Sequence, residues 1–153
     1  MVQPINGRLR LGDELVRVLK LMHAARSRTP GPAGLDHSAY PILFVLAREP
    51  HRVSDLADAI HSDVSTVSRQ VAGLSRAGYV DRAPHPADGR AQLLSLSTSG
   101  HEVVREAQER REAWLDRLLG GWSPDEISTF TARLGKFADT LQDAAGNPKD
   151  PSS

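Results

Sequence analysis

The sequence predicts a mainly α-helical protein that contains one small β-hairpin. In most segments of the chain, apolar residues recur three and four positions apart, which is the period of an amphipathic helix. Residues 79–97 differ, because two short runs of extended character flank a turn signal. A chain of 153 residues is long enough to bury a core without disulfides or metals.

The N-terminal third predicts two helices separated by a loop. The first covers residues 8–27, and residues 27–34 are dense in proline and glycine, as loops are. The second follows Asp36, a suitable N-cap, and ends near Glu49. Because Pro41 lacks a backbone donor, we expect the regular part of this helix to begin late, near Tyr40. The apolar face of the first helix is formed by Leu11, Leu15, Val18, Leu19 and Met22.

The middle of the chain predicts a short helix, a tight turn and a longer helix. Residues 53–60 form the short helix, and residues 61–63 form the turn. Asp63 is a good N-cap for the longer helix, residues 64–77, and Gly78 suits its end because glycine adopts positive φ cheaply. The side chains expected in the core are Leu56, Ala57, Ile60, Val67, Val71 and Leu74.

The predicted hairpin consists of strands 79–84 and 92–97. Between them lies the segment 85–91, in which Asp88-Gly89 is the turn signal. In the second strand, Leu94 and Leu96 alternate with serines, so one face of this strand is expected to be buried.

The last third predicts two more helices. One runs over residues 99–119 and is broken by Gly120-Gly121. The other opens with a capping box in which Ser123 and Glu126 exchange hydrogen bonds with each other's backbone. It carries an apolar seam typical of helix-on-helix packing. The tail, residues 146–153, is expected to be disordered. The residues of the seam are Ile127, Phe130, Leu134, Phe137 and Leu141.

Composition excludes several classes of protein. The chain has no cysteine, so disulfides, thiol nucleophiles and thiol redox sensing are excluded. It shows no secretory signal and no stretch suited to span a membrane, and a cytoplasmic location fits these features. The formal net charge of zero argues against indiscriminate binding of polyanions but not against specific DNA binding. No catalytic or cofactor motif is present, so neither an enzyme nor a cofactor is expected.

This order of elements describes a winged helix-turn-helix core, residues 36–98. A major groove admits one α-helix, and a second helix braces it across the backbone. The helix at 64–77 presents hydroxyls, an amide and arginines away from its apolar stripe, and such groups bond phosphates and base edges. The alternative interpretation is an ordinary solvated helix face. The candidate DNA-binding residues of this helix are Ser65, Thr66, Ser68, Arg69, Gln70 and Arg76.

Arg90 is predicted to lie at the tip of the hairpin. An exposed tip arginine is able to enter a narrow minor groove, where the negative potential is enhanced. We expect Asp88 to orient it through an ion pair. The alternative is a plain turn with a surface charge pair, which contributes little energy.

Residues 53–100 resemble the DNA-binding core of MarR-type regulators. The resemblance rests on Leu56-Ala57, on the run from Ser65 to Arg69, on the run from Gly78 to Arg82, and on Asp88 with Arg90. Leu94, Leu96 and Gly100 match the family's strand end. Two positions depart from the family pattern. Arg52 stands where a Thr or Ser cap is frequent, and at Ser97 we expect the neighbouring Thr98 to take the family's role.

The resemblance implies a single domain over residues 1–153, in which the helices at 8–27 and 99–145 form a homodimer interface. It implies that the helix at 64–77 enters the major groove of double-stranded DNA and that Arg90 contacts the minor groove. It also implies a pseudo-palindromic operator, transcriptional repression, and release of DNA by a small aromatic or phenolic effector. Some members bind zinc, which keeps that alternative open, although the six histidines here show no paired ligand spacing.

An effector site is predicted between the first two helices and the core. An arginine or histidine there would pair with a ligand carboxylate. The competing interpretation makes the aromatic members ordinary core or interface residues. The candidates are His23, Arg26, His37, Tyr40 and Trp114.

The rival function is a winged-helix protein-interaction module that does not bind DNA. The neutral net charge favours it, whereas Arg69, Arg76, Arg82 and Arg90 around one surface argue against it. Inward-pointing arginines or an acidic recognition face would support this rival.

Overall fold

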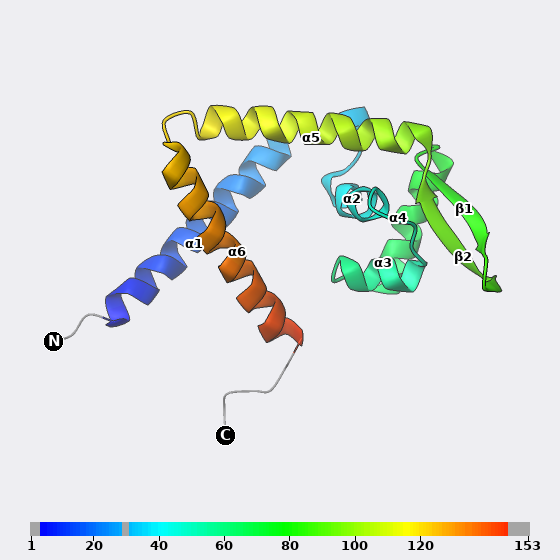
Figure 1. Cartoon of the computed structure of the whole chain (residues 1–153), viewed down its shortest axis with the longest axis horizontal. Coiled ribbons are helices and arrows are strands. Elements are labelled where there is room, and N and C mark those ends of the chain that lie inside the picture. Colours follow the sequence, from blue (N-terminus) through cyan, green and yellow to red (C-terminus); the bar gives the residue numbers. More distant parts are fainter. Residues whose placement is uncertain (1–3, 29–30, 147–153) are drawn as a thin grey trace, which may run out of the picture. The chain divides into compact units, whose positions relative to one another are not determined.

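The computed structural model describes residues 4–28 and 31–146 of the chain. In these residues it contains six α-helices, two short 3₁₀ turns and one antiparallel hairpin, so the predicted mainly helical class is confirmed. The chain divides into two compact units at Glu109/Arg110, within helix α5. Figure 1 labels the elements along the chain.

The core of the first unit is formed where three short helices meet the base of the hairpin. The helices are α2 (Tyr40–Leu46), α3 (Val53–Ala59) and α4 (Val64–Arg76). These helices pack together beside the strands β1 (Val80–His85) and β2 (Asp88–Leu96) (Figure 1). The largest fully buried side chains are Ile42, Leu43, Leu56, Val67, Val71 and Leu94.

Helix α1 (Pro4–Arg28) begins four positions before the predicted residue 8 and ends one after residue 27. Two 3₁₀ turns follow, η1 (Pro32–Gly34) and η2 (His37–Ala39). Asp36 caps η2, because its carboxylate accepts a hydrogen bond from the Ser38 amide at 2.8 Å. Helix α2 then begins at Tyr40, which confirms the late start that Pro41 imposes.

The predicted end of α2 near Glu49 was wrong, because the helix ends at Leu46. Residues 47–49 form a turn in which the Arg48 amide donates to the Val45 carbonyl at 3.1 Å. The physical reason is Pro50, whose ring disfavours helical backbone at the residue before it.

Asp63 is the N-cap of α4, as predicted, and the apolar stripe of this helix is buried. The helix ends at Arg76, and Gly78 has the expected positive φ of 82°. Between α3 and α4, His61 also adopts a positive φ, 53°, which histidine tolerates better than most side chains. This residue turns the chain into the start of α4.

The hairpin is longer than predicted, and its turn is elsewhere. His85 pairs with Asp88, so Pro86 and Ala87 form the turn and Asp88-Gly89 belongs to β2. Proline pre-sets the φ that a turn needs, and this local preference outweighs the Asp-Gly signal. Pro84 pairs with Gln92, so residues 89–91 form a bulge on β2.

Backbone pairing adds a piece of sheet that no sequence pattern indicated. His51 and Leu94 exchange two backbone hydrogen bonds, of 3.0 and 2.8 Å, in an isolated antiparallel bridge. This bridge ties the segment before α3 to the base of the hairpin.

Helix α5 (Thr98–Leu118) is capped by Ser97, a cap that was not predicted. The Ser97 hydroxyl accepts from the Gly100 amide at 3.0 Å and donates to the Gly78 carbonyl at 2.6 Å. Thr98 already lies inside the first helical turn. The serine therefore fulfils the capping role at its own position.

The second unit contains the end of α5 and helix α6 (Pro124–Gly146). The capping box is confirmed: the Ser123 amide donates to Glu126 at 2.7 Å, and the Glu126 amide donates to the Ser123 hydroxyl at 3.3 Å. The predicted disordered tail, apart from Gly146, lies outside the described residues. Within the residues that are described, no helix has both the length and the apolar character needed to cross a membrane.

Candidate nucleic-acid interface

The first turn of α4 is organised by Asp63. Its carboxylate accepts hydrogen bonds from the Ser65 hydroxyl at 2.6 Å and from the Thr66 amide at 2.8 Å. These bonds, the one from Ser65 foremost, hold the pKa of the Asp63 carboxyl well below its usual range. Because the Ser65 proton points at Asp63, the exposed Ser65 oxygen is left as an acceptor for donor groups in a partner.

Arg69 lies exposed one turn further along α4. Its guanidinium donates to the Thr66 hydroxyl at 3.3 Å, which orients the side chain along the helix. A guanidinium has five N–H donors, so a bond to Thr66 leaves a fork of donors for a phosphate or the edge of a guanine. The half-buried Thr66 and the exposed Arg69 thus form one polar patch near the start of α4.

The other predicted residues of α4 have different surroundings. Gln70 is half-buried and donates to the Ser38 hydroxyl of η2 at 3.0 Å, so its amide braces α4 against the preceding turn. Ser68 and Arg76 are exposed. The structure therefore brings Ser65, Thr66, Ser68 and Arg69 together at one end of the helix and leaves Arg76 at the other.

The wing, which we define as residues 80–96, carries Arg90 in its bulge. Asp88 accepts a hydrogen bond from the Arg90 amide at 3.1 Å. In residues 4–28 and 31–146 no ion pair joins the two side chains, so the predicted salt bridge is replaced by a bond to the backbone. Asp88 shapes the bulge, and the Arg90 side chain is exposed.

Side-chain contacts that were not predicted from the sequence connect the wing to the helices. Arg82 donates to Ser75 of α4 at 3.2 Å and to Gln92 of β2 at 3.1 Å. Arg52 donates to the ring of His85 at 3.3 Å. No local signal marks these residues, because each partner lies on a different element.

The five predicted effector residues are only partly brought together. The ring of His37 is hydrogen-bonded to the Arg26 carbonyl, with 3.0 Å between Nε2 and the oxygen, and lies 6.1 Å from the ring of Tyr40. Tyr40 is a core residue whose hydroxyl donates to the Pro32 carbonyl at 2.6 Å. His23 is exposed on α1, and Trp114 belongs to the second unit.

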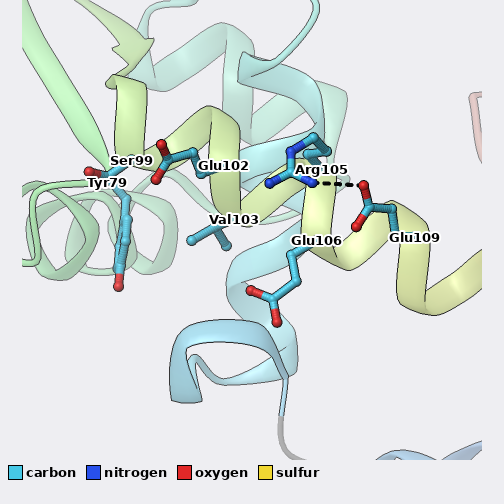
Figure 2. A pocket seen from close by; sticks show the side chains of 7 residues that line it. All are labelled: Tyr79, Ser99, Glu102, Val103, Arg105, Glu106 and Glu109. Atoms are coloured by element: carbon cyan, nitrogen blue, oxygen red, sulfur yellow. Dashed lines mark hydrogen bonds and ion pairs between the residues drawn. The ribbon is translucent and has the colours of Figure 1, made fainter.

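A cavity of about 440 Å³ lies along the first half of α5 (Figure 2). Glu102, Glu106 and Glu109 give it an acidic lining, and Arg105 pairs with Glu109 at 2.7 Å. None of the predicted effector residues lines it. In the part of the chain that the structure describes, no three histidine, aspartate or glutamate side chains gather as metal ligands.

Comparison with known proteins agrees with this arrangement. A sequence model described as the MarR family matches residues 33–91, which run from η1 into β2. An uncharacterized HTH-type transcriptional regulator of Mycobacterium bovis is 40% identical over 72% of this chain and 78% of its own length.

Two crystal structures share the fold. PcaV, a transcriptional regulator from Streptomyces coelicolor in complex with its natural ligand, is 26% identical with a TM-score of 0.66. The match covers 83% of this chain and 91% of PcaV. Streptococcus pneumoniae FabT, in complex with DNA, is 18% identical with a TM-score of 0.74 and is a likeness of fold alone. That match covers 89% of this chain and 98% of FabT.

Proposed function

This chain belongs to the MarR family of transcriptional regulators, and from this premise we propose that it binds a specific double-stranded DNA operator as a homodimer. Its relatives are named transcriptional regulators and not enzymes. The observation that carries the proposal is the exposed Arg69 on α4, which is hydrogen-bonded to the half-buried Thr66; α3 precedes this helix and the wing follows it. In this arrangement α4 enters the major groove while α3 crosses the backbone.

The second element of the DNA contact is Arg90. Its backbone is held by Asp88, and its side chain is exposed on a projecting hairpin. A cation in that position reaches the minor groove or the neighbouring phosphates. Arg69 and Arg90 thus occupy the two places where a winged helix meets a duplex. Ser68 and Arg76 add phosphate contacts, and the Ser65 oxygen accepts a hydrogen bond from the amino group of a base.

Dimerisation is supported by apolar side chains that the single chain leaves uncovered. On α6, the seam residues Phe130, Leu134 and Leu141 are 48%, 52% and 55% exposed. On α1, Leu9 and Leu19 are more than half exposed. Exposed apolar faces of this kind indicate association surfaces, because monomeric proteins seldom leave such faces in contact with water. Two-fold symmetry would place the recognition helices about 34–36 Å apart, so the operator is a pseudo-palindrome.

We further propose that the protein is a repressor, acting in the cytoplasm, that a small aromatic or phenolic ligand releases from DNA. Support comes from PcaV, whose crystal structure contains its natural ligand. In this chain the proposed site is centred on His37 and Tyr40, whose rings are 6.1 Å apart, with His23 and Arg26 of the same unit as further candidates. A histidine beside a tyrosine would suit a ligand that has both a carboxylate and a ring.

The rival function, a protein-interaction module without DNA binding, is disfavoured by the arginines of this surface. Arg69, Arg76, Arg82 and Arg90 are all exposed, whereas the rival requires them to point inward or to be outweighed by an acidic face.

The experiment that tests the proposal is fluorescence anisotropy with the promoter DNA that adjoins the protein's own gene, across a salt series and against random DNA. Tight, salt-sensitive and sequence-selective binding is the expected result. If that promoter binds no better than random DNA, selection from a random DNA library follows. A library that yields no preferred sequence would overturn the proposal and favour the rival.

A further inference from the structure

The wing meets the helix-turn-helix through a histidine whose protonation state the contacts define. The Nδ1 atom of His85, the last residue of β1, accepts a hydrogen bond from the Ala87 amide at 3.2 Å. The same Nδ1 lies 3.3 Å from Nη2 of Arg52, the residue before α3. A backbone amide and a guanidinium are both obligate donors, so Nδ1 is unprotonated and the proton of the neutral ring is on Nε2.

From this geometry we propose that the Arg52–His85 hydrogen bond sets the position of the wing and that protonation of His85 releases it. An imidazolium has protons on both nitrogens and accepts no hydrogen bond. Protonation would therefore end both contacts at Nδ1 and bring a positive ring against the Arg52 guanidinium. Histidine is the side chain that ordinarily changes charge between about pH 5 and 8.

Of the three charged groups nearest to His85, Arg52 and Asp88 favour this release and Arg90 does not. Arg52 faces it from the start of α3, and it repels an imidazolium. From β2, the pairing partner of His85 is Asp88, whose Oδ1 is engaged by the Arg90 amide. Asp88 attracts the imidazolium toward β2 and away from Arg52, while Arg90 opposes it. His51, next to Arg52, faces Glu49 at 3.8 Å instead.

The consequence for binding rests on the function proposed above. Once the wing is released, Arg90 no longer has a fixed position relative to α4. Contacts that require Arg90 to meet one particular place in the operator are therefore weakened. The imidazolium meanwhile adds a positive charge, which strengthens binding to any DNA. The ratio of affinities for operator and random DNA is therefore the quantity expected to fall with pH.

The first test needs no DNA. In the ¹⁵N-labelled full chain, NMR of the imidazole nitrogens at pH 8 should show the His85 proton on Nε2. The Ala87 amide signal should shift with the titration of the His85 ring. A proton on Nδ1, or an Ala87 amide signal that does not change as His85 is protonated, would overturn the inference whether or not the protein binds DNA.

The second test measures the operator-to-random affinity ratio from pH 8 to pH 5.5 at constant ionic strength. We expect a fall of about threefold to tenfold, the range that one hydrogen bond contributes. His85→Asn retains an acceptor that does not titrate, so its ratio should change little with pH. Arg52→Ala should have the low ratio at every pH.

The matched control is His101→Asn, at an exposed position on α5, which should keep the pH dependence of the unmodified protein. A His85→Asn variant that still loses selectivity at low pH would refute the proposed switch. If no DNA is bound selectively at any pH, the DNA function fails while the NMR result still decides the state of His85.

Discussion

The carboxylate of Asp63 accepts a hydrogen bond from the Thr66 amide at 2.8 Å and thereby begins α4 at Val64, five residues before Arg69. Thr66 then receives a bond from Arg69 through its hydroxyl. The residue that begins the helix is thus connected, through a single intermediate, to the side chain proposed to read DNA.

Asp63→Ala is expected to lower the midpoint of thermal unfolding by a few degrees at pH 7, because it removes the cap of α4. The pKa of Asp63 is lowered in the folded state, so its stabilising effect is present above the unfolded pKa of about 3.9 and is lost as pH falls through the folded pKa. Melting curves from pH 7 to pH 2 should show the gap between the two proteins closing with acid. Asp63→Asn, which retains a capping oxygen, should lie nearer the unmodified protein at pH 7.

Arg69→Ala is expected to weaken operator binding by at least ~1 kcal/mol if the guanidinium contacts a base. Random DNA should be bound nearly as before, so the affinity ratio in anisotropy titrations should fall. Arg105→Ala, which removes the same charge from an ion pair on α5, serves as the matched control and should leave the ratio unchanged. Equal losses of affinity for operator and random DNA would instead indicate that Arg69 contacts a phosphate.

Arg90→Ala is expected to reduce the dependence of log affinity on log salt by about one phosphate contact per subunit. The reason is that the bulge of the wing then lacks the exposed Arg90 cation, while Arg82 stays hydrogen-bonded to Ser75 and Gln92. Asp88→Ala, which removes the acceptor that shapes the bulge, should show a smaller change in the same direction. Affinity and salt slope that remain as in the unmodified protein would rule out the wing contact.

Phe137→Glu is expected to raise the dissociation constant of the dimer at least about thirtyfold, because a charge would replace an apolar residue of the α6 seam. Analytical ultracentrifugation over a concentration series measures this change directly. Lys136→Glu places a glutamate one position before Phe137, outside the seam, and changes the net charge more than Phe137→Glu does. This control should nevertheless leave the dimer intact. A monomeric unmodified protein would disprove the interface.

Gly100→Ala is expected to destabilise the first unit by about 1–3 kcal/mol, because the added methyl group would collide with the backbone carbonyl of Tyr79. Gly73→Ala, in the interior of α4, has open space at the same atom and should be stabilising by about 0.5–1 kcal/mol. Urea unfolding of the two variants tests the pair, and equal effects would contradict the close approach at Gly100.

Most of the helices were predictable because their signals are local. The caps at Asp63 and Ser123 act within one turn of their own helix. The apolar stripe of α4 reflects the helical period, and Pro41 limits the start of α2 through its own ring. Such features depend on neighbours in sequence, so they can be read before the chain is folded.

The predictions that failed depend on competition between local signals. Asp88-Gly89 is a sound turn signal, yet Pro86 two residues earlier forms the turn. The cap of α5 by Ser97 was not predicted, because only the pairing of the hairpin places Ser97 beside the Gly78 carbonyl.

The sequence by itself determined which side chains lie on the outer face of α4 and in the wing, because helical and strand periods assign each residue to a face. Only the tertiary structure decided what those side chains contact. Gln70 is bound to Ser38, Arg82 to Ser75, and Arg52 to His85, each across two elements. Such pairs form where elements meet, and that meeting is set by burial of the common core and not by any local pattern.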